Sequence, residues 1–227
     1  MRCTKLKSLE ILKKKGLPVG TVIDIGVHKQ TPELIQVFPD KLHLLFEPVS
    51  EFHDEIKQNY KGLNYIIFPV ALYNKRMEGW LQVFDINGRG EITHSSITFE
   101  RKENFRPIQI LTLDEVMMER HDPQPYLIKI DVDGVELQIL QGARDTLKKT
   151  SCVIIECPIS IDTNYFFDRS NFLREEGFVL WDIVDFCYYK EELSQVDLIF
   201  LRKDIKDKFF SPWKDGAFDP REWSILK

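Results

Sequence analysis

The sequence predicts an α/β fold: a doubly wound, mostly parallel sheet of seven strands. Short apolar runs alternate with helix-like segments over the first 72 residues, in the order strand-helix-strand-helix-strand. The same alternation returns after residue 114 and ends in two apolar runs, 178–186 and 196–201, which we expect to pair in antiparallel fashion. The first apolar run ends in a glycine turn that leads into a helix, an arrangement typical of nucleotide-type binding sites.

The remaining elements follow from the same patterns. The seven principal strands are predicted at 22–25, 41–47, 64–72, 126–132, 152–157, 178–186 and 196–201. Helices are predicted within 1–19, where Gly16 would form a left-handed cap, and at 32–38, 49–60, 114–118, 135–148 and 164–176. Strand-like runs at 80–85 and 107–113 surround a polar loop, 86–96, and we interpret this block as a β-hairpin insertion after the third strand or as an edge hairpin on the main sheet.

Length and composition favour a single domain of an ordinary globular protein. The 227 residues suffice for one full core, and we expect one domain over 1–227 with an unassigned tail from 203 to 227. The net charge of −5 argues against a nucleic-acid partner. No apolar run approaches the roughly 20 residues of a membrane span. Four cysteines without a CxxC pair suggest free thiols, so we expect a cytoplasmic protein. The sequence leaves the oligomeric state open.

A candidate ribose-binding acid ends the second predicted strand. Glu47 lies 23 residues after Asp24, which precedes Gly26 in the glycine turn. A carboxylate about 20 residues beyond such a turn is placed to accept hydrogen bonds from both ribose hydroxyls of an adenosine. Glycine in turn lets the backbone approach a ligand. The alternative is that Glu47 is a surface acid that caps the next helix.

Three charged residues alternate at the end of the fourth predicted strand. Lys129, Asp131 and Asp133 would face the same way if the strand stays regular. Ligands of doubly wound sheets bind beyond the carboxyl ends of the strands. Three uses remain open: a carboxylate near the transferred group or acting as general base, a Mg²⁺ site of Asp131, Asp133 and Glu136, or a Lys129–Asp131 ion pair with Asp133 as a helix cap.

Other polar residues are candidates with an equally simple alternative. His28, His94, Ser95 and Ser96 lie in predicted loops, where a histidine is either a catalytic group or a solvated side chain. Glu156 faces the ligand-binding crevice if its strand is central, or else is a buried, hydrogen-bonded acid.

Four motifs together resemble one known family. They are VIDIGVHKQT in the first strand and turn, LLFEPV at the second strand, PVALYN at the third, and LTLDEV followed by LIKIDVDGVELQILQGA. The last motif is the most specific, because it spans a strand, a turn and a helix at fixed spacing. From about Val22 to Pro158, with weaker agreement to Leu201, the chain resembles the FkbM family of S-adenosylmethionine-dependent methyltransferases.

The resemblance implies a Rossmann-like class I methyltransferase that transfers a methyl group to a hydroxyl of a sugar, a glycan or another small molecule. Asp131 would lie near the amino group or the methyl donor, and Asp131 or His94 would be the base. The candidate catalytic residues are Asp131, His94 and Lys129. The resemblance implies Asp24, Gly26, Glu47, Pro48, Val49, Ala71 and Asp131 as cofactor-binding residues, and we add His28 and Thr31 from the turn itself.

The cofactor turn departs from the commonest family sequence, G-A-N-x-G. His28 replaces the asparagine and Gln30 replaces the second glycine. A side chain at position 30 narrows the space for backbone approach and requires a conventional backbone conformation. This departure leaves a second hypothesis, a binding or scaffold protein that keeps the fold without activity. A dinucleotide-dependent oxidoreductase is disfavoured because GxGxxG is missing.

Overall fold

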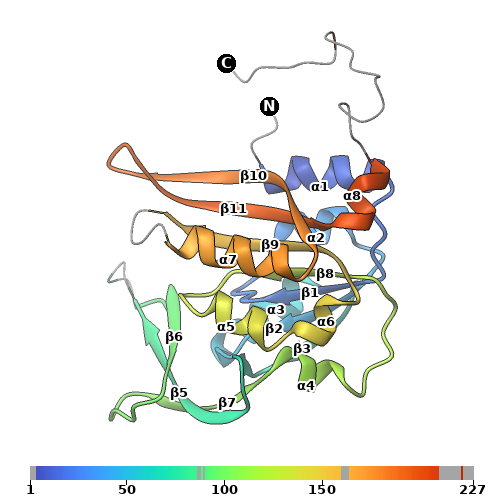
Figure 1. The fold of residues 1–227 in the computed structure, drawn as a ribbon. Helices are drawn as coiled ribbons and strands as arrows, with labels where there is room; N and C mark the ends of the chain where they lie inside the picture. The colour runs from blue at the N-terminus through green and yellow to red at the C-terminus, as the bar shows by residue number, and fades with distance from the viewer. Residues whose placement is uncertain (1–3, 86–87, 89, 160–163, 210–220, 222–227) are drawn as a thin grey trace.

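The computed structural model describes residues 4–85, 88, 90–159, 164–209 and 221. In this part of the chain seven strands form the main sheet, in the order β10-β11-β9-β8-β1-β2-β3 (Figure 1). Neighbours from β9 to β3 pair in parallel, whereas β11 runs antiparallel to both β9 and β10. The predicted fold class is therefore confirmed. The strands are β1 Thr21–Ile25, β2 Leu42–Phe46, β3 Asn64–Phe68, β8 Tyr126–Ile130, β9 Thr150–Pro158, β10 Phe178–Tyr189 and β11 Glu192–Arg202.

Helices cover both faces of this sheet. Leucines of α1 and α2 pack with Val22, Leu127 and Ile154 on one face. Residues of α4, α5, α6 and α7 pack with Ile23 and Ile128 on the other. Side chains of one strand thus alternate between two apolar layers, which makes the sheet doubly wound. The helices are α1 Lys5–Lys14, α2 Pro32–Val37, the 3₁₀ turn η1 Ser50–Phe52, α3 His53–Asn59, α4 Leu113–Met117, α5 Glu136–Gln141, α6 Arg144–Leu147, α7 Asn164–Glu175 and α8 Lys203–Phe209.

The region between β3 and α4 forms a separate sheet. The predicted insertion after the third strand is therefore confirmed, with β5 and β6 as an antiparallel pair, whereas the alternative of an edge hairpin on the main sheet is wrong. The third predicted strand, 64–72, splits after Phe68, because Pro69 has no N–H with which to continue the ladder. The chain then enters a four-stranded sheet of order β4-β7-β5-β6, drawn at the lower left of Figure 1. Its strands are β4 Ala71–Leu72, β5 Met77–Phe84, β6 His94–Thr98 and β7 Arg106–Leu111.

Two further predictions need correction. The predicted helix 135–148 is broken at Gly142, where a Cβ atom would lie 2.3 Å from the carbonyl oxygen of Tyr73. The second piece, α6, is instead held by Asp114, whose carboxylate accepts hydrogen bonds from the N–H groups of Asp145 and Thr146 at 3.0 and 2.7 Å. The predicted tail begins with α8, and residues 210–220 and 222–227 of it lie outside the described part.

The order of the strands creates a switch point between β1 and β8. From β1 the chain proceeds through β2 to β3 on one side, whereas β8 and the later strands add on the other side. Connections that diverge in this way leave a crevice at the carboxyl ends of the strands, the usual ligand site of such sheets. All five residues of β1 and all five of β8 are buried, including Asp24 and Lys129. The carboxylate of Asp24 and the ammonium group of Lys129 are therefore both buried, on neighbouring strands beneath the crevice.

Candidate active site

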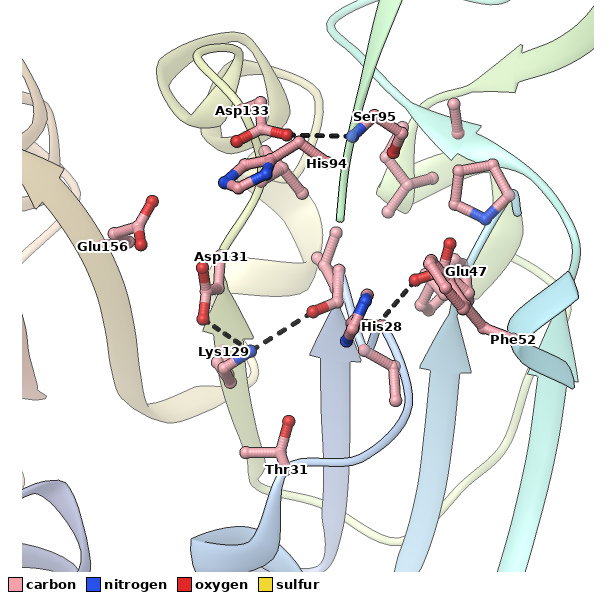
Figure 2. Close-up of a pocket in the computed structure, with 18 of the residues that line it drawn as sticks. His28, Thr31, Glu47, Phe52, His94, Ser95, Lys129, Asp131, Asp133 and Glu156 are labelled. Atoms are coloured by element: carbon pink, nitrogen blue, oxygen red, sulfur yellow. Dashed lines mark hydrogen bonds and ion pairs between the residues drawn. The ribbon is translucent and has the colours of Figure 1, made fainter. Parts of the chain in front are cut away.

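A cavity of about 410 Å³ opens at the carboxyl ends of β1, β2 and β8 (Figure 2). Residues of the second sheet and of α1 complete its wall. Within the described chain it brings together thirteen predicted site residues and leaves three, Asp24, Val49 and Glu136, outside the wall. The thirteen are Gly26, His28, Thr31, Glu47, Pro48, Ala71, His94, Ser95, Ser96, Lys129, Asp131, Asp133 and Glu156.

Gly26 holds the ends of three strands together. Its φ of +80° lies in the left-handed region, and a Cβ atom there would lie 1.9 Å from the carbonyl oxygen of Asp131. Its N–H donates to the carbonyl of Phe46 at 3.0 Å, while the N–H of Asp131 donates to Ile25 at 3.0 Å. Only glycine fits this turn without displacing the chain.

His28, rather than Gln30, carries the unusual backbone conformation of the turn. Its φ is +54°, and histidine adopts such values more readily than most residues. Gln30 is not among the described residues with positive φ, so a side chain there is compatible with the turn. The His28 ring lies edge-on to Phe52 with centroids 4.2 Å apart. Burial, reinforced by the charge of Lys29, lowers the pKa of His28.

Glu47 is fixed by two backbone N–H groups. His28 donates to Oε2 at 2.7 Å and Val49 donates to Oε1 at 2.9 Å. Val49 therefore acts behind the wall by orienting the carboxylate. Glu47 is only 3% exposed, and burial raises its pKa to about 7 against those two hydrogen bonds. Each carboxylate oxygen has two lone-pair sites, so each keeps one for a ligand.

Lys129 lies between two carboxylates. Its Nζ is 3.0 Å from Oδ2 of Asp131 and 3.4 Å from Oδ1 of Asp24, and it donates to the carbonyl of Gly26 at 3.4 Å (Figure 2). Burial disfavours its charge, yet Asp24 and Asp131 outweigh burial and raise the pKa of Lys129. The side chain is therefore a cation at neutral pH and cannot accept a proton. Asp24 also accepts a hydrogen bond from the hydroxyl of Tyr60 at 3.4 Å.

Asp131 and Glu156 form an unequal pair of acids. Burial opposes ionisation of Asp131, but the charges of Lys129 and Lys5 hold its pKa below the usual value. Burial, followed by the charge of Asp131, raises the pKa of Glu156 to about 9. Glu156 also accepts a hydrogen bond from the amide of Gln195 on β11. At neutral pH the pair consequently carries about one negative charge.

Asp133 does not continue the row that the sequence predicted. Strand β8 ends at Ile130, so Asp133 lies in the following turn and is exposed, whereas Lys129 is buried. Its carboxylate accepts a hydrogen bond from the N–H of Ser95 at 3.1 Å (Figure 2). Although the residue as a whole is exposed, partial burial of its carboxyl group raises the pKa of Asp133. His94 and Ser95, predicted in a loop, begin strand β6 and bring the second sheet over the cavity.

The sequence also matches the model of a known protein family. Residues 24–180, more than half of the chain, match the model described as the methyltransferase FkbM domain. The chain belongs to the FkbM methyltransferase family. This match confirms the resemblance that the four sequence motifs indicated.

Individual relatives of this member of the FkbM family are distant. A hexuronic acid methyltransferase of Haloferax volcanii is 25% identical over 117 residues, which are 52% of this chain and 47% of that protein. The chain thus spans about half the length of this curated relative. Among solved structures, magnesium protoporphyrin IX methyltransferase of Synechocystis has a TM-score of 0.45 at 11% identity, covering 87% of this chain and 76% of that one. A precorrin-6y C5,15-methyltransferase of Geobacter metallireducens has a TM-score of 0.44 at 14% identity, covering 84% of each chain.

The predicted magnesium ligands do not converge in this member of the FkbM family. Glu136 is 1% exposed and forms an ion pair with Arg169 of α7, away from the cavity. Asp131 is paired with Lys129, and the described residues contain no group of three metal-ligating side chains. The alternative use of Asp133 as a helix cap is also wrong, because Val135 is the N-cap of α5.

Several wall residues were not predicted from the sequence. Phe52 and Leu81 give the cavity apolar surface, and Lys5 reaches it from α1. Phe52 and Leu81 were visible only as apolar positions of their own elements. Nothing in the sequence places Lys5 near Asp131, because their proximity depends on how α1 packs against the sheet.

Proposed function

We propose that the protein is an S-adenosylmethionine-dependent methyltransferase that methylates a hydroxyl oxygen of a sugar, a glycan or another small molecule. The observation that carries this proposal is the cavity at the switch point, with the Gly26 turn and Glu47 on its wall. Membership of the FkbM family supplies the methyl-transfer class. The relative's name, a hexuronic acid methyltransferase, supports a sugar as the acceptor class.

The residues present fit such a cofactor. The missing side chain at Gly26 leaves room for close approach, and Glu47 keeps acceptor sites for two ribose hydroxyls. Pro48 and Ala71 supply apolar wall beside it, and Thr31 lines the turn. When bound, S-adenosylmethionine would supply an electrophilic methyl group on a positively charged sulfur, which suits a wall with several carboxylates.

The acceptor proton needs a base near the methylated oxygen. Asp131 is anionic and faces the cavity, and His94 is the second candidate. An oxygen becomes strongly acidic as it gains a methyl group, so even a carboxylate of low pKa accepts its proton. Lys129 would act by holding Asp131 in place, since it remains charged. The protein would therefore align the acceptor hydroxyl with the methyl group and remove the proton of that hydroxyl.

Binding of S-adenosylhomocysteine, measured by calorimetry, tests the proposal. The wild-type protein should bind it, and Glu47→Ala should weaken binding about tenfold to a hundredfold, because two hydrogen bonds to the carboxyl group are lost. Glu51→Ala is the matched control, since Glu51 lies on η1 and pairs with Arg106 instead.

The outcomes separate the hypotheses. Failure to bind at about 1 mM ligand would contradict the enzyme and favour the scaffold protein. Equal affinity of the wild type and Glu47→Ala would remove the ribose assignment while leaving the cofactor in place. Urea unfolding of each variant checks that a lost affinity is not lost folding.

A further inference from the structure

One end of the cavity is walled by acids. Asp131, Asp133 and Glu156 line it, and we call these three residues the acidic end. In Figure 2 they lie on the side opposite Glu47 and Phe52, which border the proposed adenosine position. The acidic end therefore lies away from the proposed adenosine position, on the side where the methyl donor near Asp131 and the acceptor would meet.

The two lysines of the wall are both engaged with carboxylates. Lys129 is nearly buried between Asp24 and Asp131. Lys5 lies 2.5 Å from Asp197 and 3.6 Å from Asp185, and its backbone N–H also donates to Asp185 at 2.9 Å. Within the described wall, then, each lysine already has a carboxylate partner. An incoming anion would have to compete with these short ion pairs.

The two histidines of the described wall do not provide an unpartnered cation for an incoming anion. His28 lies at the opposite end, and burial lowers its pKa, so it is neutral at neutral pH. His94 is drawn beside Asp133, so its ring already has an acidic neighbour. The raised pKa of Glu156, caused by burial and then by Asp131 and Asp197, agrees with a negative potential at this end.

We propose that the acceptor carries no carboxylate or phosphate beside the methylated hydroxyl, and that this end takes a neutral or amino-bearing sugar. The proposal rests on the proposed function and narrows its acceptor. An anion here would lie beside the carboxylates of Asp131 and Asp133, and the described part of the wall offers it no lysine without a carboxylate partner, which disfavours it. An ammonium group would find a carboxylate partner in Asp133, and a neutral hydroxyl would find acceptor oxygens in Asp133 and Glu156.

A matched series of sugars tests this assignment. Methyl glucoside, methyl glucosaminide and methyl glucuronide differ in a single substituent each, being neutral, cationic and anionic. Their binding to the S-adenosylhomocysteine complex is measured at pH 7 by saturation-transfer NMR. The glucosaminide should bind at least as tightly as the glucoside, and the glucuronide about tenfold more weakly. A glucuronide that binds as tightly as the glucoside overturns the proposal, and so does binding by none of the three.

A variant connects the discrimination to the acidic end. Asp133→Asn removes one charge but keeps an oxygen that can accept from Ser95. It should reduce the ratio of glucoside affinity to glucuronide affinity about threefold to tenfold. Glu119→Gln makes the same change in net charge at an exposed position before β8, at the other end of the strand, and should leave this ratio unchanged. An unchanged ratio in Asp133→Asn contradicts the assignment, whereas retained cofactor binding shows that the proposed function stands independently.

Discussion

Gly26 is the residue on which the turn after β1 depends. Its positive φ is one obstacle to any side chain, and the carbonyl oxygen of Asp131, 1.9 Å from where a Cβ atom would lie, is a second. Gly62 has a similar φ of +88°, yet nothing lies within 4 Å of its Cβ position. A comparison of substitutions at the two glycines therefore distinguishes the cost of a positive φ from the cost of a clash with a neighbouring atom.

Gly26→Ala should lose much more stability than Gly62→Ala. The control should cost about 1–2 kcal/mol, the strain of the left-handed conformation alone. Gly26→Ala should exceed this and should also abolish S-adenosylhomocysteine binding, because the turn must move away from β8. Urea unfolding and calorimetry measure the two effects. Equal losses in both variants would show that the close contact with Asp131 does not matter.

Glu156 should make the stability of the protein depend on pH. Its pKa rises from 4.5 to about 9 on folding, so the folded state binds the proton more tightly than the unfolded state. The contribution is therefore complete below about pH 4.5 and is lost progressively as the pH rises toward 9. Glu156→Gln should flatten the fall of unfolding free energy over this window. Glu119→Gln should leave the slope unchanged, and identical slopes in both variants would refute the assignment.

At this scale the sequence predicted which residue types would gather, but not all their partners. Gly26, Glu47 and Asp131 could be recognised because their spacing along alternating strands and turns fixes where they emerge. Asp24 was misplaced: it lies behind the wall, where it partners Lys129 and Tyr60. Position on a strand is local, whereas the partner of a buried charge depends on packing.

Among the elements, α1 depends on a buried ion pair. Side chains of Lys5 and Asp197 are 9% and 8% exposed, and they join the first helix to β11. Burial opposes the charge of Lys5, but Asp197 outweighs it and raises the pKa of Lys5. Ser8 adds a hydrogen bond to Asp182 at 2.8 Å. These contacts hold the helix across the end of the cavity.

Lys5→Met should destabilise the protein by about 3–5 kcal/mol, because Asp197 would be left buried without its cation. Replacing both partners, as Lys5→Met with Asp197→Leu, should recover much of this loss. Lys7→Met is the control on the same helix, since its pair with Glu10 is exposed and is worth less than about 1 kcal/mol. Thermal or urea unfolding reads all three, and a Lys5→Met loss no larger than that of Lys7→Met would contradict this role of the ion pair.

Two strands of the second sheet were predicted correctly, but the strands with which they pair were not. Runs 80–85 and 107–113 do form strands, β5 and β7. Their pairing with β4 and β6 instead of the main sheet follows from Pro69 and from the apolar side chains that this sheet turns toward the core. Strand periodicity cannot distinguish an added edge from a separate sheet, because both have the same alternation.

For the whole molecule, Leu81 links the two sheets. It is 3% exposed, belongs to the apolar cluster that includes Val27, Leu45 and Phe52, and also lines the cavity. A shared core predicts that the two sheets unfold together in one transition. Leu81→Ala should cost about 2–5 kcal/mol and weaken S-adenosylhomocysteine binding.

Val83→Ala is the matched control for this prediction. Val83 lies two residues along the same strand, is only partly buried, and is not part of the described cavity wall. Its loss of stability should be smaller, and its affinity should be unchanged. Circular dichroism during urea unfolding reports the number of transitions. Two separated transitions would show that the second sheet is an independent unit.

The sequence by itself determined the alternation of strands and helices, the glycine turn, the acid at the end of β2 and the family to which the chain belongs. These features are local, because periodicity and motif spacing are written over fewer than about 40 residues. Only the tertiary structure decided that Lys5 reaches the cavity, that Glu136 pairs with Arg169 instead of a metal, and that a second sheet covers the site. Each of these depends on contacts between segments that lie far apart in the sequence. Such contacts form only in the folded chain, where a charged group can be buried at low cost only beside a partner of opposite charge.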